Sequence, residues 1–180
     1  MGLVPYKHQL TLAEQGYNIL CKYKILYLAT EERTGKTLTS LLITEKCLTI
    51  NKILIVTKKQ AISGWQDTLN NYSTNKIYFV TNYHQVKNFN NKVDLIILDE
   101  AHNYISSVPK VSAIWQSIKN ISKTKPIIYI SATPYAQGYE MLFHQLALSC
   151  YSPWKHYINY YTWYNNCLLY TSDAADDLTR

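Results

Sequence analysis

The sequence predicts a single α/β domain in which a mostly parallel sheet lies between two layers of helices. Five short runs rich in β-branched and aromatic residues alternate with longer amphipathic stretches. Each run is apolar on both faces, as strands are when helices cover both sides of a parallel sheet. The alternation implies right-handed crossovers and three layers. With 180 residues, the chain can form one sizeable core but not two ordinary α/β domains. The predicted strands cover residues 25–29, 53–56, 77–80, 95–98 and 127–130.

Apolar residues at helical spacing occur between the predicted strands. A spacing of three or four residues places side chains on one helix face, which can pack against a sheet. One set precedes the first strand, a second follows it, and a third, less regular set precedes the last strand. The sets are Ala13, Tyr17, Leu20 and Cys21; Leu38, Leu41, Leu42 and Leu48; and Ala113, Ile114, Ile118 and Ile121.

The composition is that of a folded domain with a basic balance. Hydrophobic residues make up 47% of the chain and charged residues 17%, which excludes a disordered protein. The formal net charge of +6 favours anionic partners, nucleic acid first among them. A solvated basic surface without such a partner is the alternative, so the charge alone assigns no function.

The cysteines and the hydropathy pattern bear on the cellular compartment. Cys21, Cys47, Cys150 and Cys167 show no metal-ligand spacing, and we expect them to be reduced and mostly buried thiols. No apolar run approaches the length of a membrane-spanning helix, and the N-terminus has no signal-peptide pattern. We therefore expect a cytoplasmic protein without a membrane partner, in a bacterium or in the host of a phage.

The C-terminal segment has an unusual sequence. Residues 167–180 match what a common transposase-based sequencing adapter encodes in one reading frame. We interpret the segment as read-through and exclude it from fold reasoning, with an ordinary helical tail as the alternative. The predicted native domain is residues 1–166, and we expect the parent gene to continue beyond it. Independent reads of the source locus that keep the frame open through Leu178 would contradict this interpretation.

A first candidate site is Thr34-Gly35-Lys36-Thr37, which follows the first predicted strand and precedes a helix. A phosphate-binding loop needs this placement, because the amides and the dipole at a helix N-terminus favour phosphate. Gly35 lets the main chain approach closely, Lys36 can reach the β- and γ-phosphates, and the Thr37 hydroxyl can bind Mg²⁺. The strict pattern has Gly where this chain has Thr30, so a surface turn stays open as an alternative.

A second candidate site, Asp99-Glu100-Ala101-His102, stands at the C-terminal end of the fourth run. Ligands of open α/β sheets bind at the carboxyl ends of strands. There Asp99 is suited to hold Mg²⁺ through water, and Glu100 is suited to orient or deprotonate an attacking water. An acidic cap at the start of a helix is the alternative.

A third candidate site is Ser131-Ala132-Thr133, which follows the fifth run. Because Pro134 comes next, an ordinary turn is a competing interpretation. The order of the motifs gives the cluster its weight, since the phosphate loop, the acidic pair and this cluster each end a predicted strand.

In this order the three motifs resemble those of superfamily 2 helicases, in particular the DEAH-box, Swi/Snf-like ATPases. The resemblance covers Tyr6 to about Gln145 and extends to the missing first Gly, which these helicases often lack. It implies a RecA-like P-loop three-layer sandwich with ATP and Mg²⁺ as cofactors. In the family, ATP lies between two such domains, and the second domain supplies an arginine that stabilises transition-state charge. The C-terminal RecA-like domain would then be a partner of this chain.

The resemblance also assigns roles around the ATP site. Gln9 matches the glutamine that binds adenine, a task that suits an amide because it both donates and accepts; a polar helix residue is the alternative. Arg33, in the variable part of the phosphate loop, is grouped with the cofactor-binding residues. His102 and Ser131-Ala132-Thr133 are expected to couple ATP to nucleic-acid binding. A plain histidine at a helix start is equally consistent.

Nucleic-acid contacts are expected at the ends of the second and third strands. Thr57-Lys58-Lys59 resembles the family's phosphate-backbone contact, with a solvated loop as the alternative. Thr81-Asn82-Tyr83 resembles the next motif, which also contacts the tracked strand. Trp65 matches a tryptophan of Swi/Snf-like ATPases, for which core packing is favoured over base stacking. The aromatic stretch from Trp154 to Tyr164 could stack on nucleic acid, but packing in a core or interface is favoured.

These features together predict the ATP-binding half of an ATP-dependent helicase or translocase that acts on nucleic acid, with DNA favoured over RNA. Lys36, Asp99 and Glu100 are the expected catalytic residues. One alternative is a non-motor P-loop ATPase, restriction-associated or kinase-like. Another is a non-catalytic nucleotide- or DNA-binding module, but a decayed site usually loses one of its key residues, and all are present here.

Overall fold

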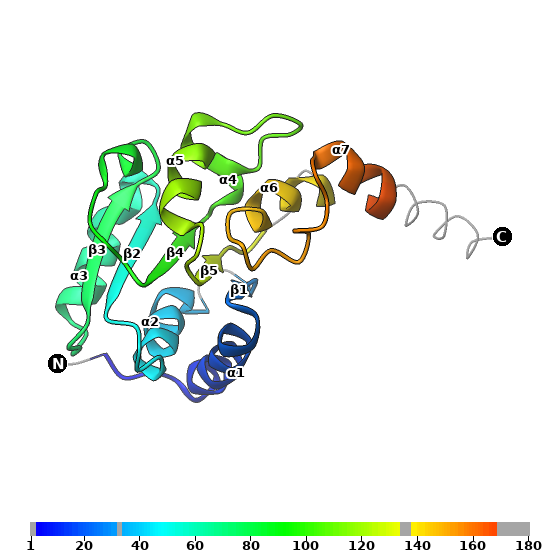
Figure 1. Ribbon diagram of the computed structural model, residues 1–180. Coiled ribbons are helices and arrows are strands. Elements are labelled where there is room, and N and C mark those ends of the chain that lie inside the picture. Colours follow the sequence, from blue (N-terminus) through cyan, green and yellow to red (C-terminus); the bar gives the residue numbers. More distant parts are fainter. Residues whose placement is uncertain (1–2, 32–33, 134–137, 169–180) are drawn as a thin grey trace.

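The sheet consists of parallel strands in a computed structural model that describes residues 3–31, 34–133 and 138–168 (Figure 1). Within these residues the strand order is β1-β5-β4-β2-β3, and every neighbouring pair is parallel. The predicted fold class and all five predicted strands are therefore confirmed. The strands are β1 (Ile25–Leu28), β2 (Lys52–Thr57), β3 (Ile77–Asn82), β4 (Leu95–Asp99) and β5 (Ile127–Ile130).

Helices cover both faces of the sheet, as the crossover rule requires (Figure 1). One layer contains α1 (Lys7–Tyr23), α2 (Lys36–Lys46) and α3 (Ile62–Asn70), the last preceded by the short helix η1 (Lys59–Ala61). The other layer contains η2 (Val86–Asn88), α4 (His102–Ile105), α5 (Ala113–Ser122) and α6 (Leu142–Leu146). The remaining described helical segments are η3 (Tyr139–Met141), α7 (Tyr160–Trp163) and the π-helical η4 (Tyr164–Leu168).

The two apolar cores lie on opposite faces of the sheet because strand side chains alternate. In β2, Ile53 and Ile55 pack with α1–α3, while Leu54 and Val56 pack with α4 and α5. All four side chains are fully buried. Burial on both faces explains why the strand sequences are apolar without alternation.

Some predicted burial is wrong at the edges of the helices. Leu48 is 87% exposed because α2 ends at Lys46, two residues before it. Ala113 is exposed as the first residue of α5. Cys21 and Cys150 are exposed, so the expectation of mostly buried thiols does not hold for them. Thr39, Ser40 and Thr44 of α2 are buried instead, with their hydroxyls bonded to main-chain carbonyls of the same helix.

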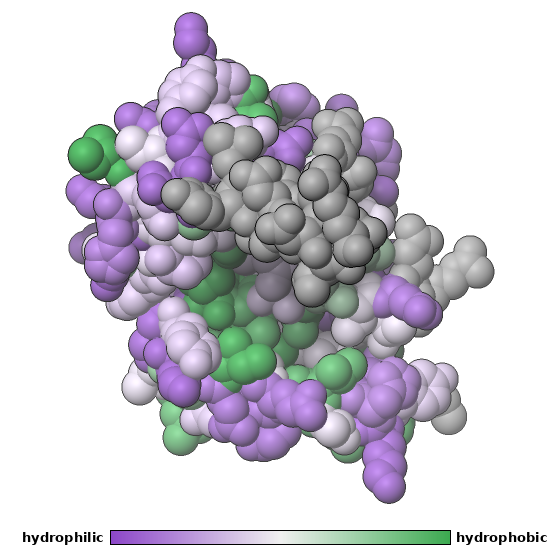
Figure 2. Space-filling view, turned by 90° about the vertical axis from the view of Figure 1, so that its right-hand side faces the viewer, coloured by the Kyte–Doolittle hydropathy of each residue, from purple (hydrophilic) through white to green (hydrophobic). Residues whose placement is uncertain are grey.

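The aromatic stretch after the last motif packs on itself and on α6. Trp163 is buried, and its ring lies 5.1 Å from that of Phe143 and 4.8 Å from that of Trp154. This agrees with the packing interpretation for these two tryptophans. Beside the stretch, an apolar hollow of about 510 Å³ lies along the open edge of β1, between Tyr27 and Leu146 (Figure 2).

Two further expectations concern the C-terminal segment and the absence of membrane-spanning helices. Of the segment 167–180, only Cys167 and Leu168 lie within them, so its interpretation as read-through stays a prediction. In the described part of the chain, no helix has the length and apolar character needed to cross a membrane.

Replacing Ile97 with Ala should lower the free energy of unfolding by about 2–5 kcal/mol, because the change leaves a cavity in the central strand β4. Leu48→Ala is the matched control and should change stability by less than about 0.5 kcal/mol, since Leu48 lies at the surface. Urea denaturation followed by circular dichroism measures both. Equal effects of the two substitutions would contradict the assignment of the core.

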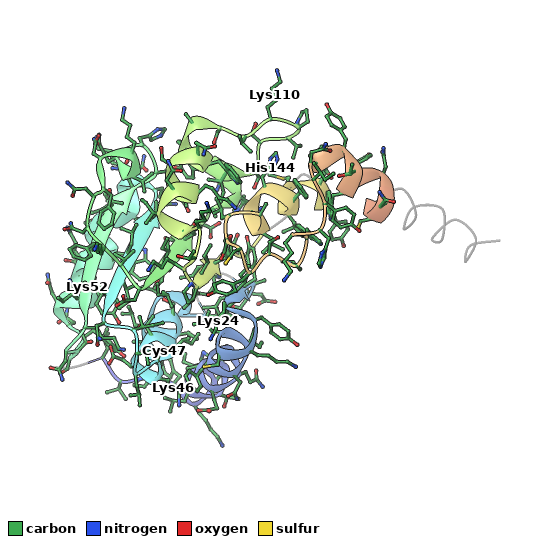
Figure 3. All side chains as sticks on the ribbon, in the orientation of Figure 1. Lys24, Lys46, Cys47, Lys52, Lys110 and His144 are labelled. Atoms are coloured by element: carbon green, nitrogen blue, oxygen red, sulfur yellow. The ribbon has the colours of Figure 1, made fainter. Side chains whose placement is uncertain are left out.

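His144 should make the stability of the fold depend on pH. Its side chain lies on α6 (Figure 3), where burial lowers its pKa and a bond of 2.6 Å from Nδ1 to the Ser107 carbonyl partly opposes this. The folded protein binds the proton less readily than the unfolded chain. The free energy of unfolding is therefore highest above the unfolded-state pKa of about 6.5 and falls as the pH drops below it.

Urea titrations at about pH 7.5 and about pH 5.5 test this expectation. His144→Asn should reduce the loss of stability between the two pH values, whereas His156→Asn, at an exposed position, should retain it. An unchanged loss in His144→Asn would show that another group is responsible.

Candidate nucleotide-binding site

The ends of three neighbouring strands meet at one edge of the sheet. Leu28 of β1, Ile130 of β5 and Asp99 of β4 lie in one row of the parallel register. Two main-chain bonds continue this row, from Ser131 N to the Leu28 carbonyl at 3.3 Å and from Glu100 N to the Ile130 carbonyl at 2.8 Å. The segments after Leu28, Asp99 and Ile130 carry the three predicted motifs, so these motifs share one edge.

The loop between β1 and α2 has the geometry of a phosphate-binding loop in its described part. Gly35, at φ 78° and ψ 34°, adopts a left-handed conformation that favours glycine, and α2 begins at the next residue. The Lys36 ammonium donates to the carbonyls of Thr30 and Glu31, both at 2.7 Å. It therefore lies over the loop in which a phosphate group would be held. The hydroxyls of Thr30 and Thr34 are 2.8 Å apart and close the loop where the strict motif has a glycine.

Gln9 packs directly against this loop from α1. Its side chain is 4% exposed, its Oε1 accepts from Tyr6 N at 2.9 Å, and its Nε2 donates to the Thr34 carbonyl at 3.4 Å. A Cβ atom at Gly35 would lie 1.9 Å from Gln9 Nε2. The structure thus places Gln9 beside the loop between β1 and α2, with its side-chain amide bonded to the main chain. Recognition of adenine by Gln9 stays a prediction.

Three side chains from other elements hold Asp99 at the end of β4. The Thr57 hydroxyl donates to Asp99 Oδ2 at 2.7 Å, and the Trp65 indole N–H donates to the same oxygen at 3.0 Å. The Tyr83 hydroxyl donates to the Asp99 carbonyl at 2.8 Å, and its ring stacks on that of Tyr104 with centroids 4.1 Å apart. Sequence reasoning missed these contacts, because no local pattern links residues 16 to 42 positions apart.

These contacts correct part of the predicted nucleic-acid interface. Thr57 is fully buried and Tyr83 is 1% exposed, so neither side chain can contact nucleic acid in this structure. Burial also raises the pKa of Tyr83 far above its ordinary value, with the charge of Asp99 contributing. Lys58 and Lys59 are exposed at the end of β2, so their contact with nucleic acid stays a prediction. Trp65 packs in the core as favoured, at 3% exposure.

Glu100, His102 and Ser131 form a hydrogen-bonded cluster next to Asp99. Ser131 Oγ lies 3.0 Å from Glu100 Oε2 and 3.1 Å from His102 Nδ1, and His102 Nδ1 lies 3.4 Å from the same glutamate oxygen. Because Ser131 donates its single proton to the carboxylate, we assign a proton to His102 Nδ1, which then donates to Ser131 Oγ. The expected contact between His102 and the Ser-Ala-Thr segment is present. The main-chain N–H of Thr133 also donates to Ser131 Oγ, at 3.0 Å, whereas the methyl side chain of Ala132 cannot form a hydrogen bond.

The main chain at Glu100 is strained. Its φ of +52° lies in the left-handed region, which is costly for a residue with a Cβ atom. The bond from Glu100 N to the Ile130 carbonyl and the bond from Ser131 to its carboxylate hold it there. Such strain is typical of residues whose orientation serves a site.

The donor set fits a magnesium ion that is bound together with a nucleotide. Thr37 and Asp99 offer oxygen atoms, the ligands that Mg²⁺ prefers. Within the described residues, no group of three or more His, Cys, Asp or Glu side chains could hold a metal by itself. Mg²⁺ commonly takes only one or two protein ligands and completes its shell with phosphate oxygens and water. Arg33, the remaining predicted cofactor contact, lies outside the described residues.

The lysine-bearing loop, the acidic pair and the Ser-Ala-Thr cluster follow adjoining strands of a parallel α/β sheet, which is the arrangement expected of a RecA-like fold. Comparison with known proteins agrees. Residues 64–136 match the family described as Type III restriction enzyme, res subunit. No curated protein matches the sequence.

Solved structures of two DNA-associated proteins share the fold. One is the SWI2/SNF2 ATPase core of Sulfolobus solfataricus in complex with dsDNA, at 16% identity and a TM-score of 0.73, over 92% of this chain and 40% of that chain. Another is a nuclease-deletion mutant of the Type ISP restriction-modification enzyme LlaGI in complex with a DNA substrate mimic. It is 21% identical with a TM-score of 0.51, over 74% of this chain and 18% of that chain. The chain thus spans less than half of either solved chain.

Gly35→Ala should abolish nucleotide binding. An alanine at this position would have to adopt the left-handed conformation of Gly35, which is unfavourable for a residue with a Cβ atom. Its Cβ would also collide with Gln9, so the loop would have to move. Gly64→Ala is the matched control, since a Cβ there meets nothing within 4 Å and Gly64 lies in α3. It should leave binding intact and stabilise the helix by roughly 0.5–1 kcal/mol. Fluorescent ATP titration and thermal denaturation check both, and wild-type affinity in Gly35→Ala would contradict the assignment of the loop.

Proposed function

We propose that this chain is the ATP-binding half of an ATP-dependent DNA helicase or translocase, which couples ATP hydrolysis to movement along DNA. One observation carries the proposal: the Lys36 loop and the Asp99–Glu100 pair lie at the same edge of the sheet, on either side of the Ser131 segment. A triphosphate and its metal would bridge the loop and the pair. The register row from Leu28 to Asp99 spans two strand spacings, or roughly 10 Å.

The residues of the loop would bind and orient the triphosphate. The N-terminus of α2 offers main-chain amides and a favourable dipole to the phosphates, and Lys36 would leave its two carbonyl partners for a phosphate oxygen. Thr37 and Asp99 would hold Mg²⁺. The ion, when bound, neutralises charge on the phosphate oxygens.

Glu100 would act on the attacking water. Its carboxylate shares Ser131 with His102, so a shift of the segment after β5 would alter its orientation. This arrangement supports the assignment of His102, Ser131 and Thr133 as coupling residues. DNA would be contacted from the surface that carries Lys58 and Lys59, whose side chains are exposed. We favour translocation without strand separation, in keeping with the Swi/Snf-like resemblance.

The described residues include no arginine, so the arginine that stabilises transition-state charge would come from a second RecA-like domain, as the resemblance implies. Loss of such an arginine costs on the order of 10³-fold or more in rate. The chain alone should therefore bind ATP·Mg²⁺ weakly and turn it over slowly. We expect a cytoplasmic location, in keeping with the free cysteines among the described residues.

Lys36→Ala should weaken ATP binding by this chain at least about 10-fold, because the change removes an ammonium group that lies at the loop. Lys46→Ala removes a lysine from the other end of the same helix, where Lys46 pairs with Glu14 at the surface (Figure 3), and should have no effect. Isothermal titration with ATP and Mg²⁺ compares them. Equal affinities would remove the basis for the nucleotide site.

Glu100→Gln should retain ATP binding but reduce hydrolysis in the protein completed with its second domain. The amide cannot accept a proton from water, and loss of a general base costs about 10²–10⁴-fold. The wild-type rate should rise on addition of duplex DNA and that of Glu100→Gln should not. An ATP hydrolysis rate that changes neither on addition of DNA nor on Lys36→Ala substitution would contradict the motor function.

A further inference from the structure

Asp99 is oriented by donors that come from a different part of the chain. We propose that Thr57 and Trp65 are positioning residues that hold the Asp99 carboxylate in the one orientation in which it can bind a metal ion. This proposal rests on the proposed role of Asp99 in Mg²⁺ binding. Neither Thr57 nor Trp65 would contact the nucleotide or the metal itself.

Both donors converge on one oxygen of the carboxylate. The Thr57 hydroxyl, at 2.7 Å, and the Trp65 indole N–H, at 3.0 Å, both donate to Oδ2. No described residue donates a hydrogen bond to Asp99 Oδ1, which leaves that oxygen for a ligand. Two donors on one oxygen fix the rotation of the carboxyl group, so the direction of Oδ1 is fixed as well.

Burial makes this orientation costly to change. Thr57 is fully buried, and Trp65 is 3% exposed. If Asp99 rotated away, a hydroxyl and an indole N–H would lose their acceptor inside the protein, which is unfavourable for buried donors. Tyr83 anchors the main chain of the same residue through its carbonyl. Asp99 is therefore held at both its main chain and its side chain before any ligand arrives.

The donors flank the exposed lysines of the predicted DNA contact. Thr57 ends β2, Lys58 and Lys59 follow directly, and η1 leads into α3, which carries Trp65. The segment from Thr57 to Trp65 thus connects the exposed lysines of the predicted DNA contact with the Asp99 carboxylate, which would bind the metal. A displacement of this segment would move both hydrogen-bond donors of Asp99 together.

The Trp65 indole signal tests the contact without nucleotide or metal. The chain has four tryptophans, so its ¹H–¹⁵N spectrum should show four indole signals that single Trp→Phe variants assign. In Asp99→Asn, the Trp65 signal should shift because a charged acceptor becomes neutral, while the Trp115 signal, whose N–H donates to the His144 carbonyl, should not. A Trp65 signal that stays in place would overturn the proposal.

Magnesium dependence tests the consequence for the metal. Thr57→Val keeps the shape of the side chain and removes the hydroxyl donor, whereas Trp65→Phe keeps an aromatic ring but removes the indole N–H. Each should raise the Mg²⁺ concentration that half-maximally strengthens binding of a fluorescent ATP analogue by about 10-fold or more, as expected when groups that orient a metal ligand are lost. Binding of the analogue in EDTA should be unchanged, and circular dichroism verifies the fold. Trp115→Phe, the matched control, should leave the Mg²⁺ midpoint unaltered.

The outcomes separate the two proposals. Mg²⁺ midpoints equal to the wild type in both Thr57→Val and Trp65→Phe would overturn the positioning role, even with the indole contact intact. If the wild-type chain failed to bind the analogue at any Mg²⁺ concentration, the proposed nucleotide site would fall, and with it the positioning role. The indole measurement would then still report whether the contact with Asp99 exists.

Discussion

The parallel register of β1, β5 and β4 is the constraint on which the candidate site depends. A row that joins Leu28, Ile130 and Asp99 brings three segments far apart in the sequence to one edge. Each segment then leaves the sheet in a different way. The segment after Leu28 turns through the left-handed Gly35 into α2, the segment after Asp99 leaves through the strained Glu100, and the segment after Ile130 leaves through Ser131. The site is thus a property of the sheet, and each loop contributes one kind of group to it.

Buried hydrogen bonds tie these groups to the protein interior. Asp99 accepts from Thr57 and Trp65 on one side, and Glu100 accepts from Ser131 on the other. A buried polar side chain without a hydrogen-bond partner costs free energy, so these hydrogen bonds favour the orientations seen here. The two carboxylates therefore have set orientations before a ligand binds, which is the preorganisation that positioning a triphosphate and a water molecule requires.

The strands and the order of the three motifs could be predicted from the sequence, because both are local patterns. Ile53 to Val56 are apolar on both faces, and Gly35 directly precedes the helix that begins at Lys36. The partners of Asp99 could not be predicted in this way. Thr57 and Tyr83 follow strands, as residues that contact nucleic acid also do, and only the packing shows that their hydroxyls turn inward. Helix ends were equally inaccessible, as Leu48 shows, because helical spacing continues past the point where α2 stops.

The central claim is that a nucleotide and its metal bind between the Lys36 loop and Asp99. A crystal structure of the chain with Mn²⁺ and a non-hydrolysable ATP analogue would test this most directly, because Mn²⁺ can be located by its anomalous scattering. The account predicts one Mn²⁺ peak between the Thr37 hydroxyl and the Asp99 carboxylate, with phosphate density at the start of α2. Analogue density elsewhere, with the Lys36 loop vacant, would contradict it.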